Sequence, residues 1–145
     1  MQAWLRYSLL ATVTVSSVAH WQPGTDATPA YYSVIPHRAL APILSPSQRT
    51  GADFSHPFQV TAYGMAAAID KVLYAQPCFC RCDRAMRHKS LHSCFEGTHA
   101  AVCATCMREG IYAYQQTKLG RTPDQIRVGI MNGEAKDIRL EDAAL

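Results

Sequence analysis

The chain has 145 residues, 48% of them hydrophobic and 17% charged, which allows one compact domain and excludes a second full one. Its formal charge of +3, from 14 Lys and Arg against 11 Asp and Glu, is too small and too scattered for a basic stripe, so nucleic acid is not an expected partner. All six cysteines lie between Cys78 and Cys106. This clustering indicates one dense site, made either of disulfides or of metal ligands.

Residues 1–19 are predicted to form a secretory signal peptide. They contain Arg6, an apolar run from Leu9 to Val18, and the small residues Ser17 and Ala19 at the positions that signal peptidase expects. The apolar run is shorter than the ~20 residues that span a bilayer. We therefore expect cleavage after Ala19 and an exported protein, periplasmic or extracellular. Membrane association is expected only if the signal is uncleaved.

Residues 20–55 are predicted to form a Pro-rich linker. Five of the eight prolines lie there among Gly, Ser, Thr and Ala, and neither a helical nor an alternating apolar period is present. Its apolar side chains Tyr31, Tyr32, Val34 and Ile35 either dock on the folded part or on a partner, or belong to a mobile arm.

Residues 56–133 are predicted to form a small all-α domain of about three to four helices, because no alternation of apolar and polar residues indicates a strand. Ser55 followed by Pro57 is typical of a helix start, with Ser55 as the cap. Apolar residues at three- and four-residue steps then predict a helix at about 56–75, which Pro77 ends.

A second helix of about 20 residues is predicted from Thr98 to Gly120. A third is predicted at about 123–131, because the residues before it form a capping box with a proline in the first turn: Thr122, Pro123 and Gln125. Gly133 would end this helix. The tail at 134–145 has little to bury and is expected to be loose or a short helical turn. A core of about 80 residues often needs a metal or disulfides.

Nine cysteines and histidines lie between Cys78 and Cys106. On the predicted second helix, His99, Cys103 and Cys106 stand at i, i+4 and i+7, so an imidazole and two thiolates share one face and can converge on an ion. Cys78, Cys80 and Cys82 alternate with other residues, which aims their sulfurs to one side of an extended segment. We expect this extended Cys-rich arm to lie along the ligand face of the helix.

The predicted metal ligands are the six cysteines and two of the histidines: Cys78, Cys80, Cys82, Cys94, Cys103, Cys106, His88 and His99. Cys94 is open between a core residue, a ligand and a disulfide partner. His20, His37 and His56 lie outside the cluster and are expected to be solvated or capping. Asp83 and Glu96 either orient ligand histidines or are ordinary solvated charges.

Thiolates favour Cu(I), Zn(II) or an iron-sulfur cluster, and a site that mixes sulfur with imidazole suits zinc and copper. Export disfavours an iron-sulfur cluster, whose loading is expected inside the cell. Six cysteines exceed the needs of one tetrahedral zinc ion. Two ions, one ion with a disulfide, and a multinuclear cuprous centre all remain open. The expected cofactor is therefore a copper or zinc ion, and its transfer would call for a protein partner.

Two other functions are compatible with the cysteines. One is an interaction module with three disulfides, although cysteines two residues apart do not usually bridge each other and histidines gather in the same window. The other is a thiol redox protein that uses Cys103 and Cys106, although no βαβ context surrounds them. No Ser/His/Asp set, phosphate-binding glycine loop or paired acidic motif occurs, so no catalytic residue is predicted.

Several motifs together carry a family resemblance: Pro77 to Cys82, HKSL at His88 to Leu91, Cys94 with Phe95, then His99, Cys103 and Cys106, and RTPDQIR at Arg121 to Arg127. Over about residues 56–131 the chain resembles the bacterial exported proteins named for a PCYCGC motif. The resemblance implies secretion or lipid anchoring and a cysteine site, but neither a substrate nor an enzymatic activity. Phe79 stands where the family has tyrosine, Arg81 where it has glycine, and no cysteine follows the signal. His92 is outside the family pattern, so the resemblance makes it the weakest of the central histidines.

Overall fold

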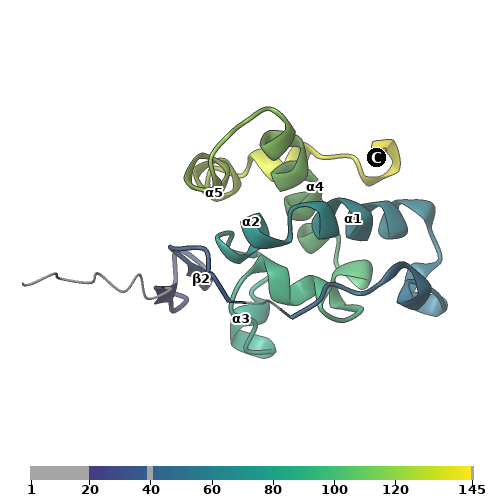
Figure 1. The fold of residues 1–145 in the computed structure, drawn as a ribbon, viewed down its shortest axis with the longest axis horizontal. Coiled ribbons are helices and arrows are strands. Elements are labelled where there is room, and N and C mark those ends of the chain that lie inside the picture. Colours follow the sequence, from purple (N-terminus) through teal and green to yellow (C-terminus); the bar gives the residue numbers. More distant parts are fainter. Residues whose placement is uncertain (1–19, 39–40, 145) are drawn as a thin grey trace, which may run out of the picture.

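The structure, a computed structural model, describes residues 20–38 and 41–144 (Figure 1). The predicted signal peptide at 1–19 lies outside the described residues. Within them the chain is mainly helical with one two-stranded sheet, which confirms the predicted helical fold class. The helices are α1 (Pro57–Ala68), α2 (Asp70–Tyr74), α3 (Cys82–Ala85), α4 (Ala104–Lys118) and α5 (Pro123–Met131). Across the described ranges, none of the helices has the length and hydropathy of a membrane span.

The first predicted helix is two helices. Its backbone breaks at Ile69, which has φ −130° and ψ 29°, so α1 ends at Ala68 and α2 begins at Asp70. The N-cap is His56, and the prediction that Ser55 caps the helix is wrong. The backbone N–H of His56 donates to Oε1 of Gln59 at 2.7 Å, and Pro57 takes the first helical position, where its missing N–H costs nothing.

The predicted second helix is interrupted at Cys103, whose extended backbone (φ −125°, ψ 103°) is the N-cap of α4. Before it lies the 3-10 turn η4 (His99–Val102). Side chains of α1 hold the backbone of Ala101 in this turn: its carbonyl accepts from Nε2 of Gln59 at 2.8 Å, and its N–H donates to the hydroxyl of Tyr63 at 3.2 Å. The prediction that His99, Cys103 and Cys106 share one face of a single helix is therefore wrong.

Helix α5 has the predicted bounds and the predicted capping box. The N–H of Gln125 donates to the hydroxyl of Thr122 at 3.3 Å, and the N–H of Thr122 donates to Oε1 of Gln125 at 2.9 Å. Gly133, with φ 84°, follows its end. The tail was expected to bury little, but the turns η5 (Glu134–Asp137) and η6 (Leu140–Asp142) bury Ala135 and Leu140 against the domain.

Helix α4 is the centre of the domain, because it contacts α1, α2, α5 and the tail turns (Figure 1). The largest fully buried side chains around it are Tyr63, Phe95, Met65, Leu73, Leu91, Ile111 and Ile126. The rings of Tyr63 and Phe95 meet edge to face, with centroids 5.0 Å apart. Phe95 follows Cys94 in the turn η3 (Leu91–Phe95), so this packing fixes the segment that carries Cys94.

Gly110 of α4 has no side chain in the space that the Phe95 ring occupies. A Cβ at position 110 would lie 2.7 Å from Cζ of Phe95, so we expect Gly110→Ala to destabilise the domain by about 1–3 kcal/mol through overpacking. The control is Gly97→Ala, where a Cβ meets no atom within 4 Å. Urea denaturation measures both variants, and equal stabilities would contradict the packing described.

The N-terminal arm, residues 20–33, docks on the helical domain. Strand β1 (Trp21–Gln22) pairs antiparallel with β2 (Tyr31–Tyr32). The ring of Tyr32 is buried and lies 5.4 Å from that of Tyr74, and the guanidinium of Arg127 lies 4.7 Å above the ring of Tyr31. Of the two expectations for the Pro-rich segment, docking on the folded part is the one observed for these tyrosines.

Candidate metal centre

The structure brings all eight predicted ligands into one cluster. Their donor atoms form three overlapping groups, and within each group the atoms lie within 4.8 Å of one another. The groups are Cys78, Cys80, Cys82 and Cys94; Cys80, His99, Cys103 and Cys106; and Cys82, His88, Cys94 and His99. That these residues bind an ion stays a prediction.

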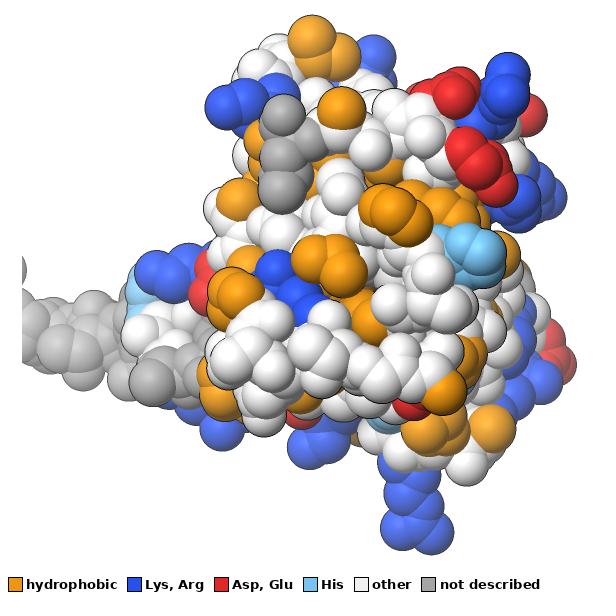
Figure 2. Space-filling model, turned by 90° about the vertical axis from the view of Figure 1, so that its right-hand side faces the viewer, with side chains coloured by type: hydrophobic (Ala, Val, Ile, Leu, Met, Phe, Trp, Pro, Cys, Tyr) orange, Lys and Arg blue, Asp and Glu red, His pale blue; other side chains and the backbone are white. Residues whose placement is uncertain are grey.

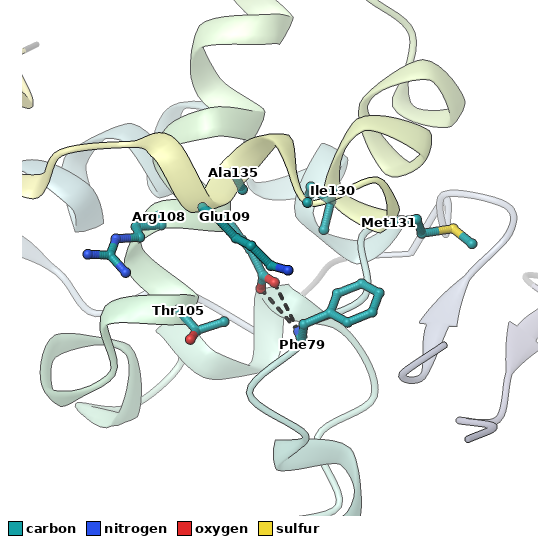
Figure 3. A pocket seen from close by; sticks show the side chains of 9 residues that line it. Phe79, Thr105, Arg108, Glu109, Ile130, Met131 and Ala135 are labelled. Atoms are coloured by element: carbon teal, nitrogen blue, oxygen red, sulfur yellow. Dashed lines mark hydrogen bonds between the residues drawn. The ribbon is translucent and has the colours of Figure 1, made fainter. Parts of the chain in front are cut away.

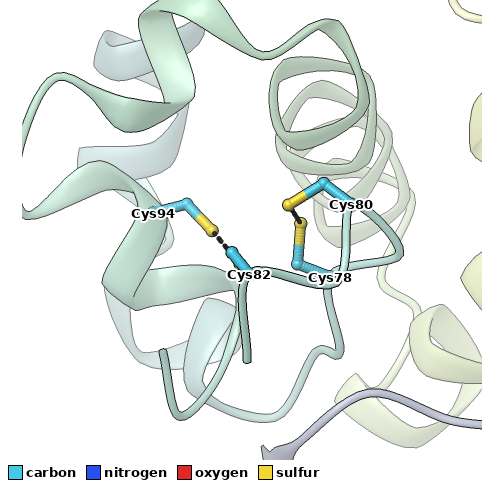
Figure 4. Close-up of side chains that lie close together, drawn as sticks. All are labelled: Cys78, Cys80, Cys82 and Cys94. Carbon is cyan, nitrogen blue, oxygen red and sulfur yellow. Dashed lines mark hydrogen bonds between the residues drawn. The ribbon is translucent and has the colours of Figure 1, made fainter. Parts of the chain in front are cut away.

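The first three cysteines converge through a turn and a short helix. The N–H of Arg81 donates to the carbonyl of Cys78 at 3.2 Å, and α3 begins at Cys82. The predicted alignment of three sulfurs along one side of an extended segment is therefore wrong. Cys78 and Cys80 instead face each other across the turn, and Cys82 faces Cys94 (Figure 4). A tight turn shortens the segment enough for all three thiols to reach one cluster.

The sulfurs are close enough to coordinate a common ion, but they are not bonded to one another. The Sγ of Cys78 lies 3.4 Å from that of Cys80 and 3.3 Å from that of Cys106, and the Sγ atoms of Cys82 and Cys94 are 3.3 Å apart. A disulfide bond is about 2.05 Å long. All six cysteines are free thiols.

The two imidazoles lie at the outer side of the cluster. Nε2 of His99 is 3.6 Å from Sγ of Cys80, and Nδ1 of His88 is 3.4 Å from Sγ of Cys94. Both rings are half-buried, as are Cys80 and Cys103, whereas the other four thiols are buried: Cys78, Cys82, Cys94 and Cys106. The cluster thus has a buried sulfur side and an accessible side that carries both histidines.

The remaining flanking residues have other roles. His92 is fully buried outside the cluster, with its ring 4.2 Å from that of Tyr74 and its Nδ1 3.0 Å from Oε1 of Glu96. Glu96 therefore orients His92 and neither of the two clustered histidines. Asp83 accepts a hydrogen bond from the N–H of Ala30 at 3.2 Å and so holds the N-terminal arm.

The crowded thiols shift one another's pKa values. The pKa of Cys94 is raised well above its usual value by hydrogen bonds to neighbouring sulfurs, Cys106 first, and by burial. The pKa of Cys80 is lowered, because Cys103 and then Cys106 hydrogen-bond to its thiolate. Thiolates this close repel one another, so ionising all of them requires a positive charge among them. A bound cation would supply that charge.

Glu109 is a buried residue beside the site that the sequence-based prediction did not include. Its carboxyl accepts the N–H of Phe79 at 3.0 and 3.3 Å and so fixes the cysteine turn to α4 (Figure 3). Burial raises its pKa to about 8, although its hydrogen bonds to Cys78 and Phe79 oppose the shift. The available signal was its spacing, because Glu109 stands three residues after Cys106 and thus on the same face of the helix. Glu109 also lines a pocket of about 210 Å³, together with Arg108 and Met131.

Arg81 ties the cysteine turn to the N-terminal arm. Its guanidinium donates to the carbonyls of Thr25, at 2.8 Å, and Asp26. Arg84 of α3 also pairs with the carboxylate of Asp26 at 2.6 Å. The backbone of Arg81 has φ 63°, in the left-handed region that favours glycine.

We expect Arg81→Gly to be more stable than Arg81→Ala by about 1 kcal/mol, because both variants lose the contacts to the arm but only glycine relieves the left-handed backbone. Urea denaturation of the two proteins gives the difference directly. Limited proteolysis at the arm should be faster in both variants than in the parent protein. Equal stability of the two variants would contradict a strained position 81.

His88 connects the cluster to the surface. It lines two pockets, one bordered by Arg38, Arg87 and Lys89 and the other by the arm residues Trp21 and Ala30. Among the described residues, no other member of the cluster lines either of these two pockets.

On the face in Figure 2, Lys and Arg side chains are dispersed among hydrophobic and neutral ones and form no continuous basic stripe.

Comparisons of the chain with protein-family models, with curated proteins and with solved structures find no match. The chemistry of the cluster itself is therefore what indicates a function.

Proposed function

We propose that this chain is an exported metal-binding protein that holds or transfers a soft ion, copper or zinc, through its Cys/His cluster. The observation that carries the proposal is the convergence of six free thiols and two imidazoles. No carboxylate of the described residues joins the three ligand groups. Sulfur and imidazole donors without oxygen select Cu(I) and Zn(II) over hard ions such as Mg²⁺ and Ca²⁺.

Access to the cluster supports exchange of the ion with a partner. Four of its thiols are buried, but His88 and His99 are half-buried, and His88 lines surface pockets. An ion can therefore reach the thiols from the histidine side without unfolding of the domain, which is the entry path that a metal-binding site needs. A protein partner that takes the ion would approach from this side.

Mass spectrometry of the native, untreated protein tests the proposal. The expected result is a mass that exceeds that of the polypeptide by the mass of bound copper or zinc. The matched variants are Cys103→Ser with Cys106→Ser, which should bind less metal, and His37→Ala, an exposed histidine outside the cluster that should bind as much metal as the parent protein. A loss of two hydrogens per cysteine pair without metal would favour a disulfide-stapled module. A mixture of thiol and disulfide forms would favour a redox protein.

Export rests on Arg6, the apolar run and the small residues before His20, and the resemblance to the PCYCGC proteins supports it. N-terminal sequencing of protein recovered from its native host should begin at His20. Recovery of the chain from the cytoplasmic fraction with Met1 in place would contradict export and leave metal binding to be judged by the mass measurement.

A further inference from the structure

The cluster offers more donors than one ion can use. A tetrahedral zinc ion takes four ligands, and the cluster presents eight. Cys78, Cys82, Cys94 and Cys106 are all buried, so donors outside the coordination sphere of a single ion would stay as thiols packed against other sulfurs. A site for one ion needs no such excess.

Three of the four residues that the ligand groups share are cysteines. Cys82 and Cys94 belong to the first and third groups, and Cys80 belongs to the first and second. A thiolate has several lone pairs and can bridge two ions, whereas an imidazole nitrogen has one and cannot. His99, the member common to the second and third groups, therefore serves only one ion.

The overlap divides the cluster into two lobes. The α4 lobe consists of Cys80, His99, Cys103 and Cys106, and the α3 lobe consists of Cys82, Cys94 and His88. Cys78 lies between them: its sulfur is 3.3 Å from that of Cys106 and belongs to one ligand group with Cys82 and Cys94. Two metal-sulfur bonds of about 2.3 Å span up to about 4.6 Å, so each close sulfur pair is within reach of one ion.

We propose that the cluster binds at least two soft ions, one in each lobe, with the thiolate of Cys78 as the fourth ligand of the α3 lobe. This inference rests on the proposed metal-binding function and specifies its stoichiometry and arrangement. Binding converts each coordinating thiol to a thiolate and releases its proton to solvent, with no change in the oxidation state of sulfur or metal.

Zn(II) and Cu(I) share this donor chemistry and differ in the number of ions that it accommodates. Zinc requires four ligands, so eight donors hold two zinc ions. A cuprous ion is satisfied by fewer sulfurs, so the same donors hold more of them. We therefore expect saturation at two Zn²⁺ per chain and at more than two Cu⁺ per chain.

Anaerobic titration of the full, reduced chain, read by native mass spectrometry, tests the inference with each metal in turn. Cys103→Ser should lose the ion of the α4 lobe and keep that of the α3 lobe, and His88→Ala should weaken the α3 lobe and keep the α4 lobe. His37→Ala, outside both lobes, should keep the full number of ions. Circular dichroism checks that each variant retains its helices.

The outcomes separate this inference from the proposed function. Saturation of the wild-type chain at one ion overturns the two-lobe arrangement and leaves metal binding intact, whereas no bound ion with either metal overturns both. Because the stoichiometry is measured first on the wild-type chain, a variant that fails to fold does not change that result. Complete loss of every ion in both folded single variants would also overturn independent lobes. One remaining ion in each variant supports them.

Discussion

Removal of the bound ions is expected to lower the melting temperature of the loaded protein by roughly 10–20 °C. An ion present at about a thousandfold excess over its Kd stabilises the fold by about 4 kcal/mol, and each kcal/mol changes the melting temperature of a domain of this size by several degrees. The predicted ligands come from the cysteine turn, α3 and the loop after it, η3, η4 and α4, so a bound ion would tie these segments together. Circular dichroism during titration with a thiol-compatible chelator follows the change.

The control for this experiment is the double variant Cys103→Ser with Cys106→Ser, whose melting should respond less to the chelator. A melting curve that stays unchanged while the ion is stripped from the wild-type protein would show that the core alone holds the fold. Unfolding by reductant, with no ion ever present, would instead identify disulfides as the stabilising element.

In the metal-free, reduced protein, the contribution of Glu109 to stability, measured against Glu109→Gln, is expected to fall by about 2 kcal/mol between pH 6.5 and pH 8. Burial raises the pKa of this carboxyl from 4.5 to about 8, so it keeps its proton in the folded chain after it has lost it in the unfolded chain. At this carboxyl the folded state therefore binds more protons in this range, and the contribution of Glu109 to stability falls as pH rises. The comparison with Glu109→Gln is needed because the lowered pKa values of His88, His92 and Cys80 contribute in the opposite direction, and they do so in both proteins.

Glu109→Gln should remove this contribution, since an amide can still accept the hydrogen bond from Phe79 but does not ionise. Glu141→Gln removes an exposed carboxyl and should keep the slope of the parent protein. Urea denaturation at several pH values gives the slopes. A variant at position 109 that retains the parent slope would show that the dependence arises from other groups.

The parts of the molecule that could be predicted from the sequence are those that depend on local chemistry. Helix α5 follows from Thr122, Pro123 and Gln125, which satisfy its first turn without help from the rest of the fold. The eight clustered residues follow from their type and proximity in the sequence, because all of them lie within residues 78–106.

The parts that could not be predicted depend on tertiary contacts. The break at Cys103 exists because Gln59 and Tyr63, about 40 residues earlier, bond to the backbone of Ala101. The burial of Glu109 depends on how the cysteine turn lies against α4, and a charged residue in a helix is usually exposed. Docking of the arm depends on Tyr31 and Tyr32, which are too isolated among prolines to form a pattern.

The contacts of the N-terminal arm also determine an order of assembly. Thr25 and Asp26 pair with Arg81, which lies 56 and 55 residues further along the chain. During synthesis the arm is therefore made first and stays without its partners until the cysteine turn has been added. The eight donors, in contrast, come from a single stretch that needs only a short loop closure to gather. Collection of the thiols can thus precede closure of the arm over α3, and the cysteine turn is open to solvent on that side until closure is complete.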